Sequence, residues 1–326
     1  MKPFKSLLLA GAFVGAALTQ TSAWSQTKWD VPTSYASSIY QVKVLEKFSE
    51  NIRQASNGQL NPVVHANASL FKLNEIKRAV QTGQVQMGEM LVGLLENENK
   101  AFGADTVPFL ATSFSEAYAL WQASKPVYEA YLAKQGLKLL YSVPWPPNAL
   151  LTKGPIESLA DLKGLKWRAY NPATSRFGEL IGAQPVTVAT VDLSQAVATG
   201  VVDGLATASS VAVQLKLYET MSHFYVMNAW LPRNMVIVNV RAFNALDEQT
   251  QQIILREAAE AEKLGWQMAE EDERANLATL AENGMQVLPV PPQLQSELEE
   301  VGQTMLAEWL KSAGPDGQAI VDAYRQ

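Results

Sequence analysis

The side chains that could carry out chemistry are few in this sequence. It contains no cysteine and two histidines, His65 and His223. Without cysteine there is no disulfide, thiolate metal site, iron–sulfur cluster or thiol nucleophile. The two histidines lie far apart and neither belongs to an HxH or HxxxH pair, so a metal site or a histidine-based triad is poorly supplied. We therefore expect a binding protein with no catalytic residue, no metal and no cofactor.

The most promising binding group is Arg168, within residues 166–170 (KWRAY), which are predicted to form a strand. A planar guanidinium offers two parallel donors to a carboxylate, so an arginine contributes geometric selectivity as well as energy. Side chains alternate along a strand, which places Tyr170 on the face of Arg168 and Trp167 on the opposite face, toward the core. Taken alone, Arg168 is more simply explained by an ordinary surface ion pair.

Two further polar groups lie close to predicted strand boundaries. Glu89 is near the end of a strand predicted over residues 85–90, and strand ends in α/β proteins point into the ligand-binding crevice. It either accepts a hydrogen bond from a ligand opposite Arg168, or is a solvated acid or a partner of Arg168 in the empty protein. Asn234, which follows Arg233, lies where the chain crosses between units and either reaches the cleft or caps the hinge.

Aromatic residues gather in the same parts of the sequence. The candidate wall for the apolar part of a ligand consists of Trp145, in the Pro-rich corner 144–147, together with Tyr170 and Trp230. For Trp145 and Trp230, plain core packing is an equal alternative.

The order of the predicted elements indicates how these side chains are positioned. Three strands alternate with two helices, at residues 28–32, 37–56, 60–65, 74–82 and 85–90. We expect Asn74 to cap the second helix and Gly83 to end it. This order is typical of a parallel sheet with right-handed crossovers. A helix over residues 115–135, kinked or broken at Pro126, and a strand over 137–143 then lead to the Pro-rich corner.

A second α/β unit is predicted after that corner, which is a candidate crossing between domains. Its strands and helices are expected at residues 150–152, 158–162, 166–170, 173–181, 185–188, 193–199 and 202–205. Residues 235–240 (MVIVNV) predict a buried strand that returns the chain to the first unit. Residues 247–283 predict a helix long enough to span two domains, and two terminal helices follow at 294–310 and 315–324.

Residues 1–25 have the pattern of a Sec-type signal peptide, in which Lys2 and Lys5 precede an apolar run over residues 7–18. As a helix this run spans roughly 18 Å, against about 30 Å for a bilayer core, so we expect cleavage after Ser25 rather than a permanent anchor. The mature chain would then be periplasmic. With 26 Lys and Arg against 32 Asp and Glu, the formal charge of −6 offers no basic surface, which excludes nucleic acid as a partner.

Residues 155–210 resemble the extracytoplasmic solute-binding proteins of TRAP (tripartite ATP-independent periplasmic) transporters. The matching motifs are "DLKGLKWR", "LIGAQP" and "AVATGVVDG", which supply Asp161, Gly164, Lys166, Arg168, Leu180, Gly182, Ala183, Pro185, Ala198, Gly200, Asp203 and Gly204. The resemblance continues in "VQTGQVQMGEM", "VPFL" and "NMVIVN", and so covers nearly the whole mature chain.

The resemblance implies an α/β fold class, a two-domain periplasmic-binding-protein-like fold with a hinge and a long domain-spanning helix. We assign residues 26–145 and 234–273 to domain I, and residues 146–233 and 274–326 to domain II. The resemblance also implies a receptor, not an enzyme, that closes around a small organic acid and delivers it to one small and one large integral membrane subunit. In that family the arginine of the K-x-R strand, here Arg168, binds the ligand carboxylate.

Two departures from the family pattern bear on the ligand. Where sugar-acid-binding members have a second arginine and an asparagine, this sequence has Asn148 and Thr207. One fixed positive charge remains, and we expect Asn148 and Thr207 to hydrogen-bond the second carboxylate oxygen or a neighbouring oxygen. With the aromatic wall, this predicts a monocarboxylate, preferably an aromatic or branched 2-oxo or 2-hydroxy acid. The alternatives are a lyase or isomerase with Glu89 as general base, and a sensory binding protein for a membrane kinase.

Overall fold

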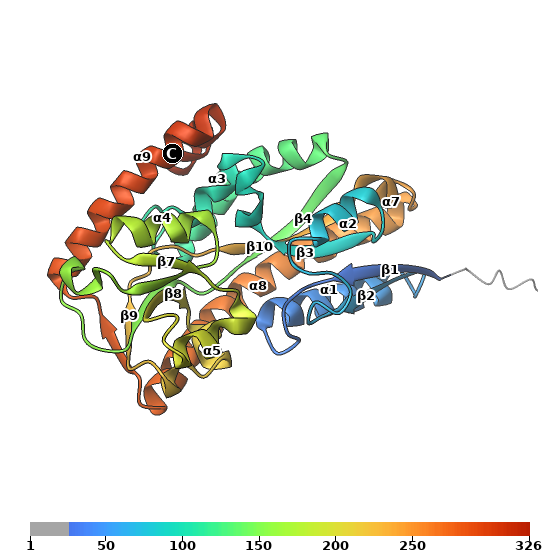
Figure 1. Cartoon of the computed structure of the whole chain (residues 1–326). Coiled ribbons are helices and arrows are strands. Elements are labelled where there is room, and N and C mark those ends of the chain that lie inside the picture. The colour runs from blue at the N-terminus through green and yellow to red at the C-terminus, as the bar shows by residue number, and fades with distance from the viewer. Residues whose placement is uncertain (1–25) are drawn as a thin grey trace, which may run out of the picture.

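The computed structural model describes residues 26–326, so the predicted signal peptide lies outside the described residues. Two units of sheet and helix lie side by side, the first at the right of Figure 1 and the second at the left. Within residues 26–326, each helix is too short or too polar to cross a membrane.

The first unit is built on two small sheets. Strand β1 (Thr27–Pro32) pairs in parallel with β2 (Leu60–His65), and helix α1 (Tyr40–Ala55) connects them. The second sheet has the order β3-β10-β4, with β3 at Met87–Leu91, β10 at Arg233–Asn239 and β4 at Leu137–Pro144. The prediction of one parallel sheet is therefore wrong beyond β1 and β2, because β3 pairs antiparallel with β10. All seven residues of β10 are buried, and insertion between β3 and β4 gives this returning strand a neighbour on both edges.

The helices of the first unit follow the predicted pattern with two corrections. Helix α2 (Ile76–Thr82) ends at Gly83 as expected, at a φ of 78° that glycine adopts without strain, but Glu75 and not Asn74 precedes it, without a side-chain cap. Helix α3 (Phe114–Lys134) continues through Pro126, so the predicted break is wrong. Pro126 lies on the exposed face, where water can satisfy the carbonyl that loses its helical bond. Shorter helices are η1 (Val92–Asn97), η2 (Lys100–Thr106) and α7 (Val240–Asn244).

The second unit contains a six-stranded mixed sheet with the order β11-β9-β5-β8-β6-β7. The strands are β5 (Asn148–Thr152), β6 (Lys166–Ala169), β7 (Gln184–Thr187), β8 (Gly204–Ala208), β9 (His223–Val226) and β11 (Gln286–Pro289). The helices are η3 (Leu159–Leu162), α4 (Pro172–Leu180), η4 (Thr190–Asp192), α5 (Leu193–Ala198), α6 (Ser209–Gln214) and η5 (Leu217–Glu219). Strand β5 runs antiparallel to β8, whereas β6 runs parallel to β8. The first residue of β5 therefore lies beside the last residues of β6 and β8.

Two short segments cross between the units and are hydrogen-bonded to each other. The backbone N–H of Trp145, after β4, donates to the carbonyl of Pro232 at 2.7 Å, and that of Asn148 donates to the carbonyl of Trp230 at 2.9 Å. These paired crossings bring the start of β5 and the start of β10 together, which is the geometry of a two-stranded hinge.

Two long helices also join the units. In α8 (Glu248–Glu282), Ile254 lies in the core of the first unit and Leu280 in that of the second, which confirms the predicted domain-spanning helix. Helix α9 (Pro292–Tyr324) is broken at Gly314, which lies between the two terminal helices predicted at residues 294–310 and 315–324. Its early residue Leu298 packs in the second unit, but Ile320 packs against the first, although residues 274–326 were assigned to domain II.

Candidate functional site

The predicted site residues lie at or near the ends of strands, on the sides of the two units that are joined by the two crossing segments. Residues at the end of β6 and β8 and at the start of β5 supply one side, namely Arg168, Tyr170, Thr207 and Asn148. The end of β3 and the start of β10 supply Glu89 and Asn234, and the crossings supply Trp145 and Trp230. All of these residues are buried except Tyr170, which is half-buried.

Arg168 is a buried cation that has no anionic partner in the part of the chain that the structure describes. It is 3% exposed, its Nε donates to the carbonyl of Val188 at 3.1 Å, and its Nη2 donates to Oγ1 of Thr190 at 2.9 Å. Among the described residues no carboxylate forms an ion pair with it, and its Nη1 makes no hydrogen bond. Burial lowers the pKa of Arg168 to about 10, which still leaves it charged at neutral pH. An unpaired buried charge is costly, so this position favours an anionic ligand.

Tyr170 and Trp230 form one wall beside this cation. The guanidinium carbon of Arg168 lies 5.0 Å from the centre of the Tyr170 ring, and the indole Nε1 of Trp230 donates to the Tyr170 hydroxyl at 3.1 Å. Trp230 also packs edge-on against Phe177 at 5.3 Å, so it belongs to the core of the second unit as well as to the site wall. Trp167 is completely buried in that core, as its place on the strand predicted.

Asn148 and Thr207 lie at the same sheet edge but not on the same face. Thr207 is opposite Ala149 in the ladder between β5 and β8, so alternation places Asn148 on the other face of the sheet. Neither side chain makes a hydrogen bond to any residue in the range 26–326, although both are nearly buried. Both side chains therefore remain available for a hydrogen bond, one on each face of the sheet.

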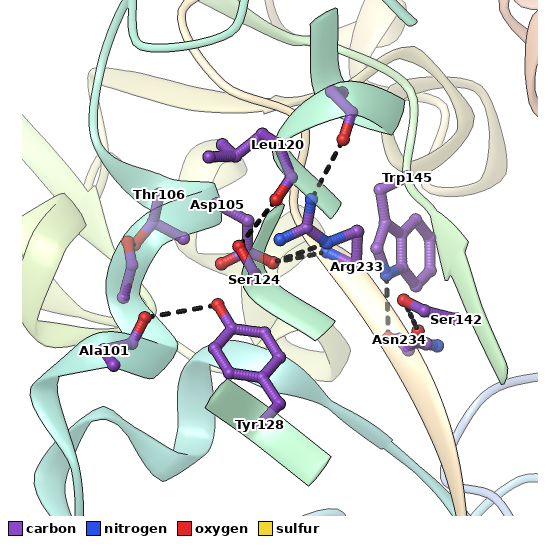
Figure 2. Close-up of polar contacts among 12 residues, drawn as sticks. Ala101, Asp105, Thr106, Leu120, Ser124, Tyr128, Ser142, Trp145, Arg233 and Asn234 are labelled. Carbon is purple, nitrogen blue, oxygen red and sulfur yellow. Dashed lines mark hydrogen bonds and ion pairs between the residues drawn. The ribbon is translucent and has the colours of Figure 1, made fainter. Parts of the chain in front are cut away.

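The first unit contributes a second cluster around Trp145. Its indole Nε1 donates to Oδ1 of Asn234 at 2.9 Å (Figure 2). The ring of Tyr35 packs edge-on against Trp145, with 5.0 Å between centroids. Burial raises the pKa of Tyr35, and the nearby Glu89 and Tyr170 raise it further, so the Tyr35 hydroxyl lies among groups from both units.

Glu89 is 2% exposed and accepts a hydrogen bond from the hydroxyl of Thr33 at 2.5 Å. Burial raises the pKa of Glu89 to about 7, an effect that Thr33 and Asn234 oppose. Of the alternatives drawn from the sequence, a solvated acid is wrong, because the side chain is buried. An ion pair with Arg168 is also wrong in the described residues, where Glu89 forms no ion pair.

Arg233 points away from this site, although it adjoins Asn234 in β10 (Figure 2). It is completely buried, and its Nε lies 3.8 Å from Oδ2 of Asp105, which also accepts the Arg233 backbone N–H at 2.9 Å. Its guanidinium lies over Trp121 at 5.4 Å. Alternation along β10 thus sends Arg233 into the core of the first unit and Asn234 toward Trp145.

Sequence reasoning missed Thr33, Tyr35 and Asp105. Thr33 and Tyr35 follow the end of β1. Because strand ends point into the ligand-binding crevice, their place after a predicted strand could have marked them as site residues. Asp105 has no local signal, because its partner lies 128 residues away. Within residues 26–326, no group of three or more His, Asp or Glu side chains is arranged to hold a metal ion.

Comparison with known proteins gives consistent matches. The family model of bacterial extracellular solute-binding proteins, family 7 (DctP), matches residues 33–312. DctP6 of Bordetella pertussis, an extracytoplasmic solute receptor that binds pyroglutamic acid, is 47% identical, with a TM-score of 0.89 over 92% of this chain and 99% of that chain. A marine metagenome TRAP solute-binding protein specific for pyroglutamate is 39% identical, with a TM-score of 0.88 over 92% of this chain and 99% of that chain. Among curated relatives, the ectoine/5-hydroxyectoine-binding periplasmic protein of Ruegeria pomeroyi is 25% identical over 96% of this chain and 94% of its own length.

Proposed function

Because the chain belongs to the DctP family of bacterial extracellular solute-binding proteins, we propose that this TRAP solute receptor captures pyroglutamate. It is a receptor and not an enzyme. Arg168 binds the ligand carboxylate, and closure of the hinge encloses the ring. The protein then delivers its ligand to the small and large membrane subunits of the transporter from the periplasm, after removal of residues 1–25.

The observation that carries this proposal is the buried, unpaired guanidinium of Arg168. The Arg168 guanidinium is 3% exposed and has no counter-ion among the described residues. A carboxylate that accepts two parallel hydrogen bonds from it would stabilise the charge. Since Asn148 and Thr207 are neutral, a second carboxylate would have no fixed positive charge at this edge. A monocarboxylate therefore fits better than a dicarboxylate.

Pyroglutamate is the favoured monocarboxylate because the solved receptors at 47% and 39% identity bind it. Asn148 and Thr207 contact the carboxylate from opposite faces of the sheet edge, while Trp145, Tyr170 and Trp230 pack against the ring.

The experiment is a calorimetric titration of protein freed of bound ligand by unfolding and refolding. L-Pyroglutamate is compared with phenylpyruvate and 2-oxoisovalerate, which represent the aromatic and branched acids expected from the sequence. We expect pyroglutamate to bind at least about 100-fold more tightly than either 2-oxo acid. Tighter binding of a 2-oxo acid would overturn the assignment of pyroglutamate and restore the ligand class predicted from the sequence.

A further inference from the structure

We propose that Glu89 and Asn234 recognise the lactam amide of the ligand, with Glu89 accepting from the ring N–H and Asn234 Nδ2 donating to the ring carbonyl. The inference rests on the proposed function, and extends it from the carboxylate end of the ligand to the ring. It makes the first unit the part of the molecule that selects a cyclic amide over other small cyclic acids.

The two side chains lie on one face of the same sheet. In the antiparallel ladder, Asn234 is opposite Leu91 and Val236 is opposite Glu89. Glu89 and Asn234 are therefore diagonal neighbours, at backbone positions about 7–8 Å apart. Diagonal neighbours in an antiparallel pair have their side chains on the same face of the sheet. Their polar ends can thus contact adjacent atoms of one ligand.

Trp145 fixes which atom Asn234 presents. An indole N–H can only donate, so the atom that accepts from Trp145 must be the amide oxygen Oδ1, and Nδ2 is left as a donor. Asn234 is 1% exposed, and its Nδ2 is buried without a hydrogen-bond partner in the described residues. A buried donor without an acceptor is costly, and a ligand carbonyl oxygen relieves that cost.

Glu89 supplies the matching acceptor. Oε2 accepts from Thr33, whereas Oε1 has no hydrogen-bond partner of normal geometry among residues 26–326. The Asn234 amide lies near enough to lower the pKa of Glu89, so the two side chains point toward the same space. A five-membered lactam holds its N–H and its C=O side by side on one edge, as a donor next to an acceptor. An acceptor from Glu89 and a donor from Asn234 complement that edge, and Arg168 complements the carboxylate attached beside the N–H.

The test uses the lactone analogue 5-oxotetrahydrofuran-2-carboxylate, in which a ring oxygen replaces the N–H while the carboxylate and the ring carbonyl are retained. At pH 8, we expect the wild-type protein to bind pyroglutamate at least about 50-fold more tightly than the lactone, because the ring oxygen would face the Glu89 carboxylate. Equal affinities for lactam and lactone would overturn the inference while leaving the binding of pyroglutamate intact.

Two substitutions separate the two contacts. Glu89→Gln is isosteric, removes a buried charge and can turn its amide to donate to the ring oxygen, so the preference for the lactam should fall below about fivefold. Asn234→Ser removes a donor that both ligands use, so it should weaken both by about tenfold and leave their ratio unchanged. Melting temperatures without ligand verify that each variant is folded.

Each remaining outcome is also decisive. A ratio unchanged by Glu89→Gln, or an affinity for pyroglutamate unchanged by Asn234→Ser, would overturn the role of that residue. Failure of the wild-type protein to bind pyroglutamate at all would overturn the proposed function, and this inference with it.

Discussion

Two arginines, Arg168 and Arg233, are almost completely removed from solvent, yet within residues 26–326 only Arg233 has a carboxylate partner. Arg233 contacts Asp105 in the core of the first unit, while Arg168 contacts a carbonyl and a hydroxyl at the edge of the second sheet. A paired buried charge is explained by the fold alone. An unpaired one is costly, and an anion that binds from outside relieves that cost.

The pair in the first unit is itself imperfect. Nε and Nη2 of Arg233 and Oδ1 of Asp105 have no hydrogen-bond partner among the described residues, and Nη1 donates to the carbonyl of Ala117 at 3.2 Å. Burial raises the pKa of Asp105 to about 6, although Arg233 opposes this rise. We infer that the pair anchors the start of β10, since Asp105 also accepts the Arg233 backbone N–H. That anchor lies one residue before Asn234.

The largest expected effect is the loss of ligand binding in Arg168→Met. Methionine keeps much of the side-chain volume and removes the only charge assigned to the ligand carboxylate. We expect pyroglutamate affinity to fall by about 1,000-fold, or about 4 kcal/mol, in calorimetric titration. The free energy of unfolding without ligand should stay within about 1 kcal/mol of the wild type or rise, because a buried unpaired charge has been removed. Unchanged affinity in a folded variant would refute the carboxylate contact.

The reverse pattern is expected for Arg233→Met, the matched control in the first unit. Removing Arg233 leaves the Asp105 carboxylate buried without its cation, so the free energy of unfolding should fall by about 3 kcal/mol in urea denaturation. The folded fraction should bind pyroglutamate within about fivefold of the wild type, because Arg233 points away from the site. A large loss of affinity without a loss of stability would erase the distinction between the two arginines.

Much of this fold was predictable because its signals are local. The continuous apolar run of β10 and the long charged helix α8 could be recognised from composition and periodicity, and both connect the units as expected. The partner of β3 could not be recognised, since a strand pattern specifies which residues are buried and not which strand lies beside it. The same limit hid Asp105, whose contact with Arg233 depends on residues far apart in the chain.

The candidate site was predictable to a similar degree. Arg168 was identified by its family motif, and alternation along the strand correctly separated it from Trp167. Sequence alone could not indicate that Arg168 lacks a counter-ion among the described residues or that Trp145 orients the Asn234 amide, because both depend on distances between residues far apart in the chain. Nor could it place Asn148 and Thr207 on opposite faces, which depends on the register of β5 against β8.

A smaller, pH-dependent effect tests whether desolvation outweighs the ion pair at Asp105. Its pKa is about 6 in the folded protein against an ordinary value of 3.8, so between these values the native state binds more protons than the unfolded state. Stability from this group is therefore greatest below pH 4 and declines as pH rises to 6, by at most about 1.4 kcal/mol per pH unit. The measurement is the stability of wild type relative to Asp105→Asn at pH 4.5 and 7.5. A relative stability that increases with pH would mean that Arg233 lowers the pKa instead.

The smallest effect is expected at an exposed arginine with better geometry than either buried one. Arg176 of α4 makes a bidentate contact with Glu308 of α9, through Nε at 3.0 Å and Nη2 at 2.7 Å. Its side chain is 42% exposed, so water and salt screen the pair, and Arg176→Met should change the free energy of unfolding by less than about 1 kcal/mol. Measured in the same urea denaturation series, it separates burial from hydrogen-bond geometry. If Arg176→Met lowered the free energy of unfolding as much as Arg233→Met, hydrogen-bond geometry and not burial would determine how much these ion pairs stabilise the protein. The burial of Arg168 without a counter-ion would then no longer indicate a ligand site.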